Sequence, residues 1–93
     1  MPTPLSKPIE IVPGLVICDP AVHEGQPVFI GTDVLVKTLL DYREGQSPLY
    51  EFLLDFPEVR PWQAKHFMKW WAEQERNGVQ DVLAWLLALR DRS

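Results

Sequence analysis

A short cationic segment carries the side chains best suited to binding a nucleic acid. The residues that recur there at i, i+3, i+4 and i+7, and so share one face of a helix, are Trp62, Lys65, His66 and Lys69. Lysines bind phosphates, and the side chains of Gln63 and His66 can hydrogen-bond to base edges in the major groove. With Arg60 just before them, these residues predict a DNA-recognition helix. The alternative is an ordinary solvated face, which many mildly basic helices have.

A second group, Cys18, His23 and Glu24, contains a potential nucleophile and potential metal ligands. It lacks the Cys-x-x-Cys and His-Glu-x-x-His spacings that hold zinc. The glycines of residues 25–32 also differ from a phosphate-binding loop, which needs a glycine-rich turn leading from a strand into a helix. We therefore expect these three to be loop residues near a strand end. We predict no enzymatic activity, no bound metal and no cofactor.

Charge is spread unevenly along the chain, which has 9 basic and 13 acidic residues and a formal net charge of −4. Residues 41–58 contain five acids and one base, whereas residues 60–76 contain four bases and two acids. Nonspecific DNA binding comes from cations that neutralise phosphates, so the acidic total argues against an indiscriminate nucleic-acid binder. Any DNA contact is expected to be local and to use the segment with the basic surplus.

Two short runs of aliphatic and β-branched residues, 15–18 and 28–30, predict two strands joined by a loop, which is a β-hairpin. Ile9, Ile11 and Val12 can add an edge strand before a Pro-Gly turn, although so short a run does not decide the matter.

The spacing of apolar residues becomes helical after residue 32. A first helix is expected from about residue 36, with Gly45 as its stop. Ser47 is the expected N-cap of a second helix, which has Pro48 in its first turn and ends before Pro57.

A third helix is expected from Pro61 to about residue 77, and a fourth over roughly residues 79–90. The buried stripe of the third helix should comprise Ala64, Phe67, Met68 and Trp71. The predicted fold is mainly α, with a short N-terminal β-hairpin, a three-helix core and an extra C-terminal helix.

The fourth predicted helix is apolar around its whole circumference over residues 82–89. Such a helix needs cover on more than one side, which a chain of 93 residues can hardly supply. We expect a homodimer about a two-fold axis, or a partner protein, to cover it; complete burial within the chain is the alternative. The residues expected at this interface are Val82, Leu83, Trp85, Leu86 and Leu89.

The length fits one domain, expected over residues 9–93 after a flexible N-terminal tail of residues 1–8. The single cysteine excludes an internal disulfide and is compatible with a reducing compartment. No secretion signal is seen, and no run reaches the roughly 18 apolar residues of a membrane span. We expect a cytoplasmic protein that does not insert into a membrane.

Several short motifs, in their order along the chain, resemble a known family. They are Asp19-Pro20, Gly25-Gln26-Pro27-Val28-Phe29, Gly31-Thr32, Val34-Leu35-Val36, Gly45 and Phe56-Pro57. Over residues 9–71 the chain resembles domain-of-unknown-function (DUF) family 433. The resemblance implies a homeodomain-like or winged helix-turn-helix fold. It also implies kinship with VapB-type antitoxins, which bind PIN-domain ribonuclease toxins and repress their own operons by binding operator DNA.

We therefore expect an antitoxin-like DNA-binding protein of a toxin-antitoxin pair, which regulates its own transcription through the helix-turn-helix. Ile30 and Asp33 stand where the family usually has arginine, and an acidic side chain repels phosphate. This difference favours the alternative function, a homodimeric protein-interaction module on the same fold that has lost DNA binding.

Overall fold

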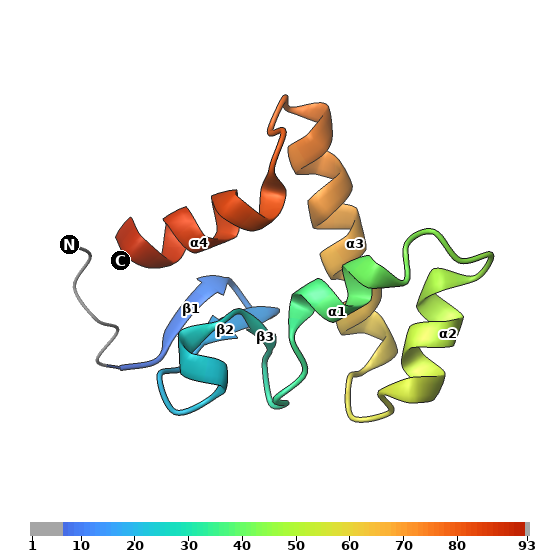
Figure 1. Cartoon of the computed structure of the whole chain (residues 1–93), viewed down its shortest axis with the longest axis horizontal. Helices are drawn as coiled ribbons and strands as arrows, with labels where there is room; N and C mark the ends of the chain where they lie inside the picture. Colours follow the sequence, from blue (N-terminus) through green and yellow to red (C-terminus); the bar gives the residue numbers. More distant parts are fainter. Residues whose placement is uncertain (1–6, 93) are drawn as a thin grey trace.

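The computed structural model describes residues 7–92, which form a mainly helical domain with a small N-terminal sheet. Its strands and α-helices are β1 (Ile9–Val12), β2 (Val16–Cys18), β3 (Val28–Phe29), α1 (Val36–Asp41), α2 (Pro48–Asp55), α3 (Pro61–Arg76) and α4 (Val82–Arg92). Figure 1 shows α4 beside the sheet at one end of the molecule and α2 at the other end. The predicted mainly helical fold with a short β-hairpin is confirmed. Residues 1–6 of the predicted tail lie outside the described residues.

The strands form one antiparallel sheet in the order β1-β2-β3. The predicted hairpin is the β2–β3 pair, in which Val16 lies opposite Phe29. β1 is an edge strand, so the structure decides the question that the short apolar run of residues 9–12 left open. It folds back onto β2 through Gly14, whose φ of +75° is a left-handed conformation that glycine adopts at little cost. The N–H of Leu15 donates to the carbonyl of Val12 at 2.9 Å and closes this turn.

Prolines begin two of the helices as predicted. Pro48 and Pro61 lie in the first turns of α2 and α3, where a missing N–H costs no helical hydrogen bond. Ser47 stands at the N-cap of α2, but its side chain makes no capping hydrogen bond. Its backbone, with φ −135° and ψ 69°, lies outside the extended geometry that suits a side-chain cap. The predicted helix start and the N-cap position of Ser47 are therefore right, although the Ser47 side chain does not cap the helix.

α4 begins at Val82, three residues later than predicted, because residues 77–81 form its connection to α3. Gly78 follows the end of α3 in a left-handed conformation, with a φ of +92°. The N–H of Val79 then donates to the carbonyl of Gln74 at 3.0 Å and satisfies one of the last carbonyls of α3. Residue 79 thus closes α3, and the Asp81 carboxylate accepts a hydrogen bond from the first turn of α4.

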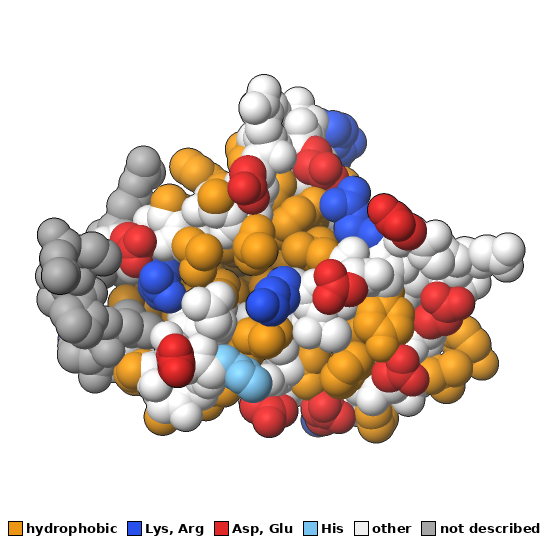
Figure 2. All heavy atoms as spheres, viewed as in Figure 1, with side chains coloured by type: hydrophobic (Ala, Val, Ile, Leu, Met, Phe, Trp, Pro, Cys, Tyr) orange, Lys and Arg blue, Asp and Glu red, His pale blue; other side chains and the backbone are white. Residues whose placement is uncertain are grey.

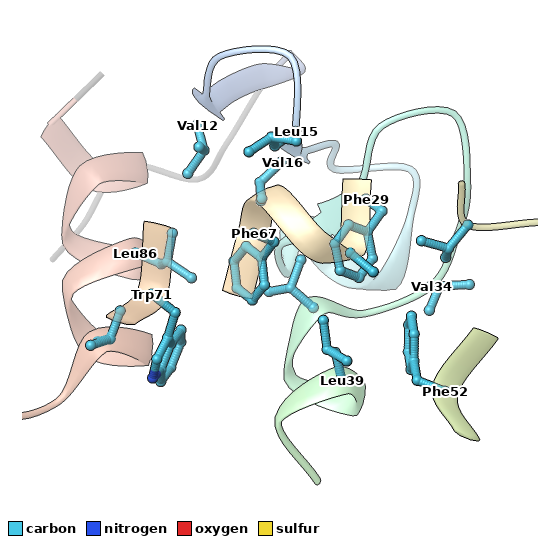
Figure 3. Close-up of a cluster of buried hydrophobic side chains, with 14 residues drawn as sticks. Val12, Leu15, Val16, Phe29, Val34, Leu39, Phe52, Phe67, Trp71 and Leu86 are labelled. Carbon is cyan, nitrogen blue, oxygen red and sulfur yellow. The ribbon is translucent and has the colours of Figure 1, made fainter. Parts of the chain in front are cut away.

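An aromatic cluster joins the sheet to the helices (Figure 3). Phe29 of β3 packs against Phe52 of α2, with ring centroids 5.9 Å apart, and edge-to-face against Phe67 of α3 at 5.5 Å. All three side chains are fully buried. The stripe predicted for α3 lies in or against this core through Ala64, Phe67, Met68 and Trp71.

Replacing Phe67 with alanine should lower the free energy of unfolding by about 3–5 kcal/mol, because it leaves a cavity next to Phe29. Urea unfolding followed by circular dichroism measures this change. Tyr50→Ala is the control, since Tyr50 is 67% exposed and its truncation should cost less than about 0.5 kcal/mol. Equal losses in the two variants would contradict the assigned core.

Candidate nucleic-acid interface

α3 has a buried face and an exposed face, as its spacing predicts. The exposed face carries Trp62, Lys65, His66 and Lys69. The rings of Trp62 and His66 meet edge-to-face, with centroids 6.0 Å apart. The sequence-predicted stripe is therefore a continuous basic and aromatic surface along one helix.

The lysines of this face carry charges that no described residue neutralises. Lys65 and Lys69 form no ion pair within residues 7–92, whereas the guanidinium of Arg43 pairs with Glu75 at 3.3 Å. Arg60, also exposed, occupies the N-cap position of α3. The positive end of the α3 helix dipole adds partial positive charge near it. The arrangement can therefore bind an anion such as a phosphate.

Gln63 is not part of the exposed face, so its prediction as a base-reading residue is wrong. Its side chain is only 4% exposed. Its Oε1 accepts the N–H of Arg60 at 3.0 Å, and its Nε2 donates to the carbonyl of Ile30 at 2.9 Å. Gln63 lies one turn before Phe67 on the buried face of α3, so the helix directs its amide toward the sheet.

The hydrogen bond from Gln63 to the carbonyl of Ile30 joins the start of α3 to the turn at residues 31–33, and we call this contact the joint. Thr32 Oγ1 donates to the carbonyl of Phe29 at 2.9 Å, which holds the turn against β3. Gln63 bonds the carbonyl that immediately precedes the turn, so the turn and the start of α3 are directly linked. The exposed Asp33 therefore extends from a turn that is linked to the buried side of the start of α3.

Cys18, His23 and Glu24 do not form a reactive cluster. The Cys18 thiol is fully buried, and this burial raises its pKa to about 11, so it stays protonated and is a poor nucleophile. His23 instead donates from Nε2 to the carbonyl of Asp33 at 2.7 Å. Among residues 7–92, no three His, Cys, Asp or Glu side chains are placed to hold a metal ion.

The interface residues predicted on α4 fall into two groups. Val82 and Leu86 are 2% and 0% exposed and belong to the core of the chain itself, so their prediction as dimer or partner contacts is wrong. The cover comes from β1 and α3, against which α4 packs. Leu83, Trp85 and Leu89 are half-buried. No helix in the described part of the chain is long and apolar enough to cross a membrane.

The sequence interpretation missed an exposed apolar pair on α2. Tyr50 and Leu54 are 67% and 64% exposed. They lie four residues apart, and this spacing predicts that they share one face of a helix. In Figure 2, hydrophobic and acidic side chains lie next to each other at the right of the view, where α2 is. The exposed acids of α2 and its flanking segments are Asp41, Glu44, Glu51, Asp55 and Glu58.

Comparison with known proteins gives one match. A family model described as "Protein of unknown function (DUF433)" matches residues 16–70. This range runs from β2 into α3 and includes the joint between Gln63 and the turn at residues 31–33. Comparisons with curated proteins and with solved structures found no match.

Gln63→Leu should lower the free energy of unfolding by about 1–3 kcal/mol, because the N–H of Arg60 and the carbonyl of Ile30 both lose their partner. Chemical denaturation measures the loss. The control is Gln46→Leu at an exposed position, which should change the stability by less than about 0.5 kcal/mol. A Gln63→Leu variant as stable as the wild type would show that this amide does not hold the joint.

Proposed function

Because the chain belongs to DUF433, a family of unknown function, we propose its function from its own surfaces. In this proposal it is an antitoxin-like protein that binds operator DNA through a helix-turn-helix made of α2 and α3. It acts in the cytoplasm as a homodimer, represses its own operon and binds a PIN-type toxin. It catalyses no reaction and needs no cofactor.

The arrangement of α2 and α3 supports a helix-turn-helix. α2 ends at Asp55 and α3 begins at Pro61, so a short turn separates two helices that pack together. Val59 anchors this turn in the core and is 1% exposed. α3 has 16 residues and is about 24 Å long, which suits a helix lying in a major groove.

The observation that carries the proposal is the basic outward face of α3. Lys65 and Lys69 are exposed and form no ion pair with a described residue, so they can bind phosphates without first breaking an internal contact. Trp62 and His66 share this face and can contact sugars or base edges. The acids of α2 repel DNA from the neighbouring surface and orient it toward α3.

DNA binding is tested with a fluorescent fragment of the region upstream of the gene. The wild-type protein should bind it in a salt-dependent manner. Lys65→Ala combined with Lys69→Ala should weaken binding about tenfold and reduce the slope of log K against log salt concentration by about 1–2. Fluorescence anisotropy at several salt concentrations measures both quantities.

The control for this experiment is Lys37→Ala, which removes an exposed lysine from α1 and should leave the affinity unchanged. Wild-type protein that does not bind the fragment would contradict the proposal. So would equal affinities of the wild type and the double variant.

A second candidate function is a homodimeric protein-interaction module that does not bind DNA. Asp33 favours it, since an exposed carboxylate on a turn next to α3 repels phosphate. A dimer can use the outward side of α4, where Ala84 is exposed and Leu87 is half-buried. This side is still available after Val82 and Leu86 have been buried in the core.

Leu87→Lys should weaken such a dimer about tenfold or more, because it places a charge in an apolar contact. Sedimentation equilibrium measures the dissociation constant. Ala72→Lys introduces the same charge at an exposed position of α3 and should leave the dimer intact. A wild-type chain that stays monomeric at high concentration would exclude this dimer.

A further inference from the structure

α2 presents an apolar pair to solvent. Tyr50 and Leu54 are 67% and 64% exposed and lie one turn apart on a helix of 8 residues. Single apolar residues on a surface are common, but two that share a helix face form a patch. Phe52 is fully buried, so α2 cannot rotate to bury the pair without exposing the aromatic core.

Exposed acids adjoin this pair on the same helix. Glu51 precedes Leu54 by three residues, and Asp55 follows it directly. We define the α2 face as the exposed residues Tyr50, Glu51, Leu54 and Asp55. Three further exposed acids lie in the flanking segments, and they are Asp41, Glu44 and Glu58.

No described base neutralises the α2 face. The single base of residues 41–58 is Arg43, and its guanidinium contacts residues of α3. There it pairs with Glu75 at 3.3 Å and lies 5.8 Å from the centre of the Trp71 ring. Glu51 and Asp55 form no ion pair within the described range. The α2 face therefore keeps a negative potential.

α2 is also held in place from the side of α1. The hydroxyl of Tyr42 donates to Asp55 Oδ2 at 2.6 Å, and this hydrogen bond raises the pKa of Tyr42. The Tyr42 ring packs edge-to-face on Phe52 at 5.6 Å and on Phe56 at 6.3 Å. A surface that is already ordered loses little conformational entropy when a ligand binds to it.

We propose that the α2 face binds a basic, amphipathic segment of a partner protein. Apolar side chains of that segment pack against Tyr50 and Leu54, and its lysines or arginines face Glu51 and Asp55. Charge complementarity defines the partner, because an apolar patch edged by acids that form no ion pair with a described residue attracts a cationic peptide and repels a nucleic acid. The inference rests on the partner-binding part of the proposed function and is independent of DNA binding by α3.

A second copy of the chain fits the α2 face less well than a separate partner. Its exposed basic helix face is that of α3, which the proposed function assigns to DNA. A contact between the α2 face of one chain and α3 of another also joins unlike surfaces, and contacts of this kind lead to rings or open filaments.

The test uses a synthetic helical peptide of leucine and lysine, with its leucines on one face, and the full ¹⁵N-labelled chain. In an NMR titration the peptide should shift the backbone amides of residues 48–55, and added salt should weaken its binding. Tyr50→Ser combined with Leu54→Ser should weaken binding about tenfold. Circular dichroism should show an unchanged fold, because both side chains are exposed.

Matched controls separate binding at the α2 face from binding at α3, and apolar contacts from charge. Trp62→Ser removes a large side chain that is 48% exposed on α3 and should leave peptide binding unchanged. The Lys65→Ala, Lys69→Ala variant should also bind the peptide, so a failure of DNA binding is distinguishable from a failure of this inference. A peptide of equal charge with serine in place of leucine should bind about tenfold more weakly.

Four results would overturn the inference. Amide shifts centred on α3 or α4 would place the binding site elsewhere. Equal affinities of the double-serine variant and the wild type would show that Tyr50 and Leu54 do not contribute to peptide binding. Equal binding of the two peptides would show that charge alone drives it. Self-association that the double-serine variant abolishes would assign the α2 face to a second copy.

Discussion

The packing of Phe29 between α2 and α3 is the contact on which the rest of the structure depends. Phe29 belongs to a strand of only 2 residues, yet its ring meets both Phe52 and Phe67, and the next carbonyl, that of Ile30, accepts the Gln63 amide. So short a strand has few backbone hydrogen bonds, and burial of its side chains holds it in place. This joint defines how α2 and α3 are oriented, and so where their outward faces lie.

Both helices turn their apolar sides toward this joint, and their outward sides carry opposite charge. α3 exposes Lys65 and Lys69, whereas α2 exposes Glu51 and Asp55. Surfaces of opposite potential attract different ligands. One small domain can in this way offer separate surfaces to a nucleic acid and to a protein, which is the combination that the proposed function requires.

Local chemistry made most of the fold and part of the candidate interface predictable. Pro61 and Gly78 mark the two ends of α3 because each suits a backbone geometry found at a helix end. The spacing of Lys65 and Lys69 places them on one face for the same local reason. The spacing of Gln63 from Phe67 points to the buried face, but its residue type does not decide, because an amide on a helix suits water or a buried carbonyl equally well.

The sequence by itself determined the hairpin, the order of the helices, the two faces of α3 and the resemblance to the family. Only the tertiary structure decided which apolar and polar groups are inside: Val82 and Leu86 are covered by the chain's own β1 and α3, and Gln63 reaches the carbonyl of Ile30. The physical reason is that periodicity records which side of an element is apolar. Burial depends on neighbours that are distant in sequence, such as Ile30 and Gln63, whose positions differ by 33.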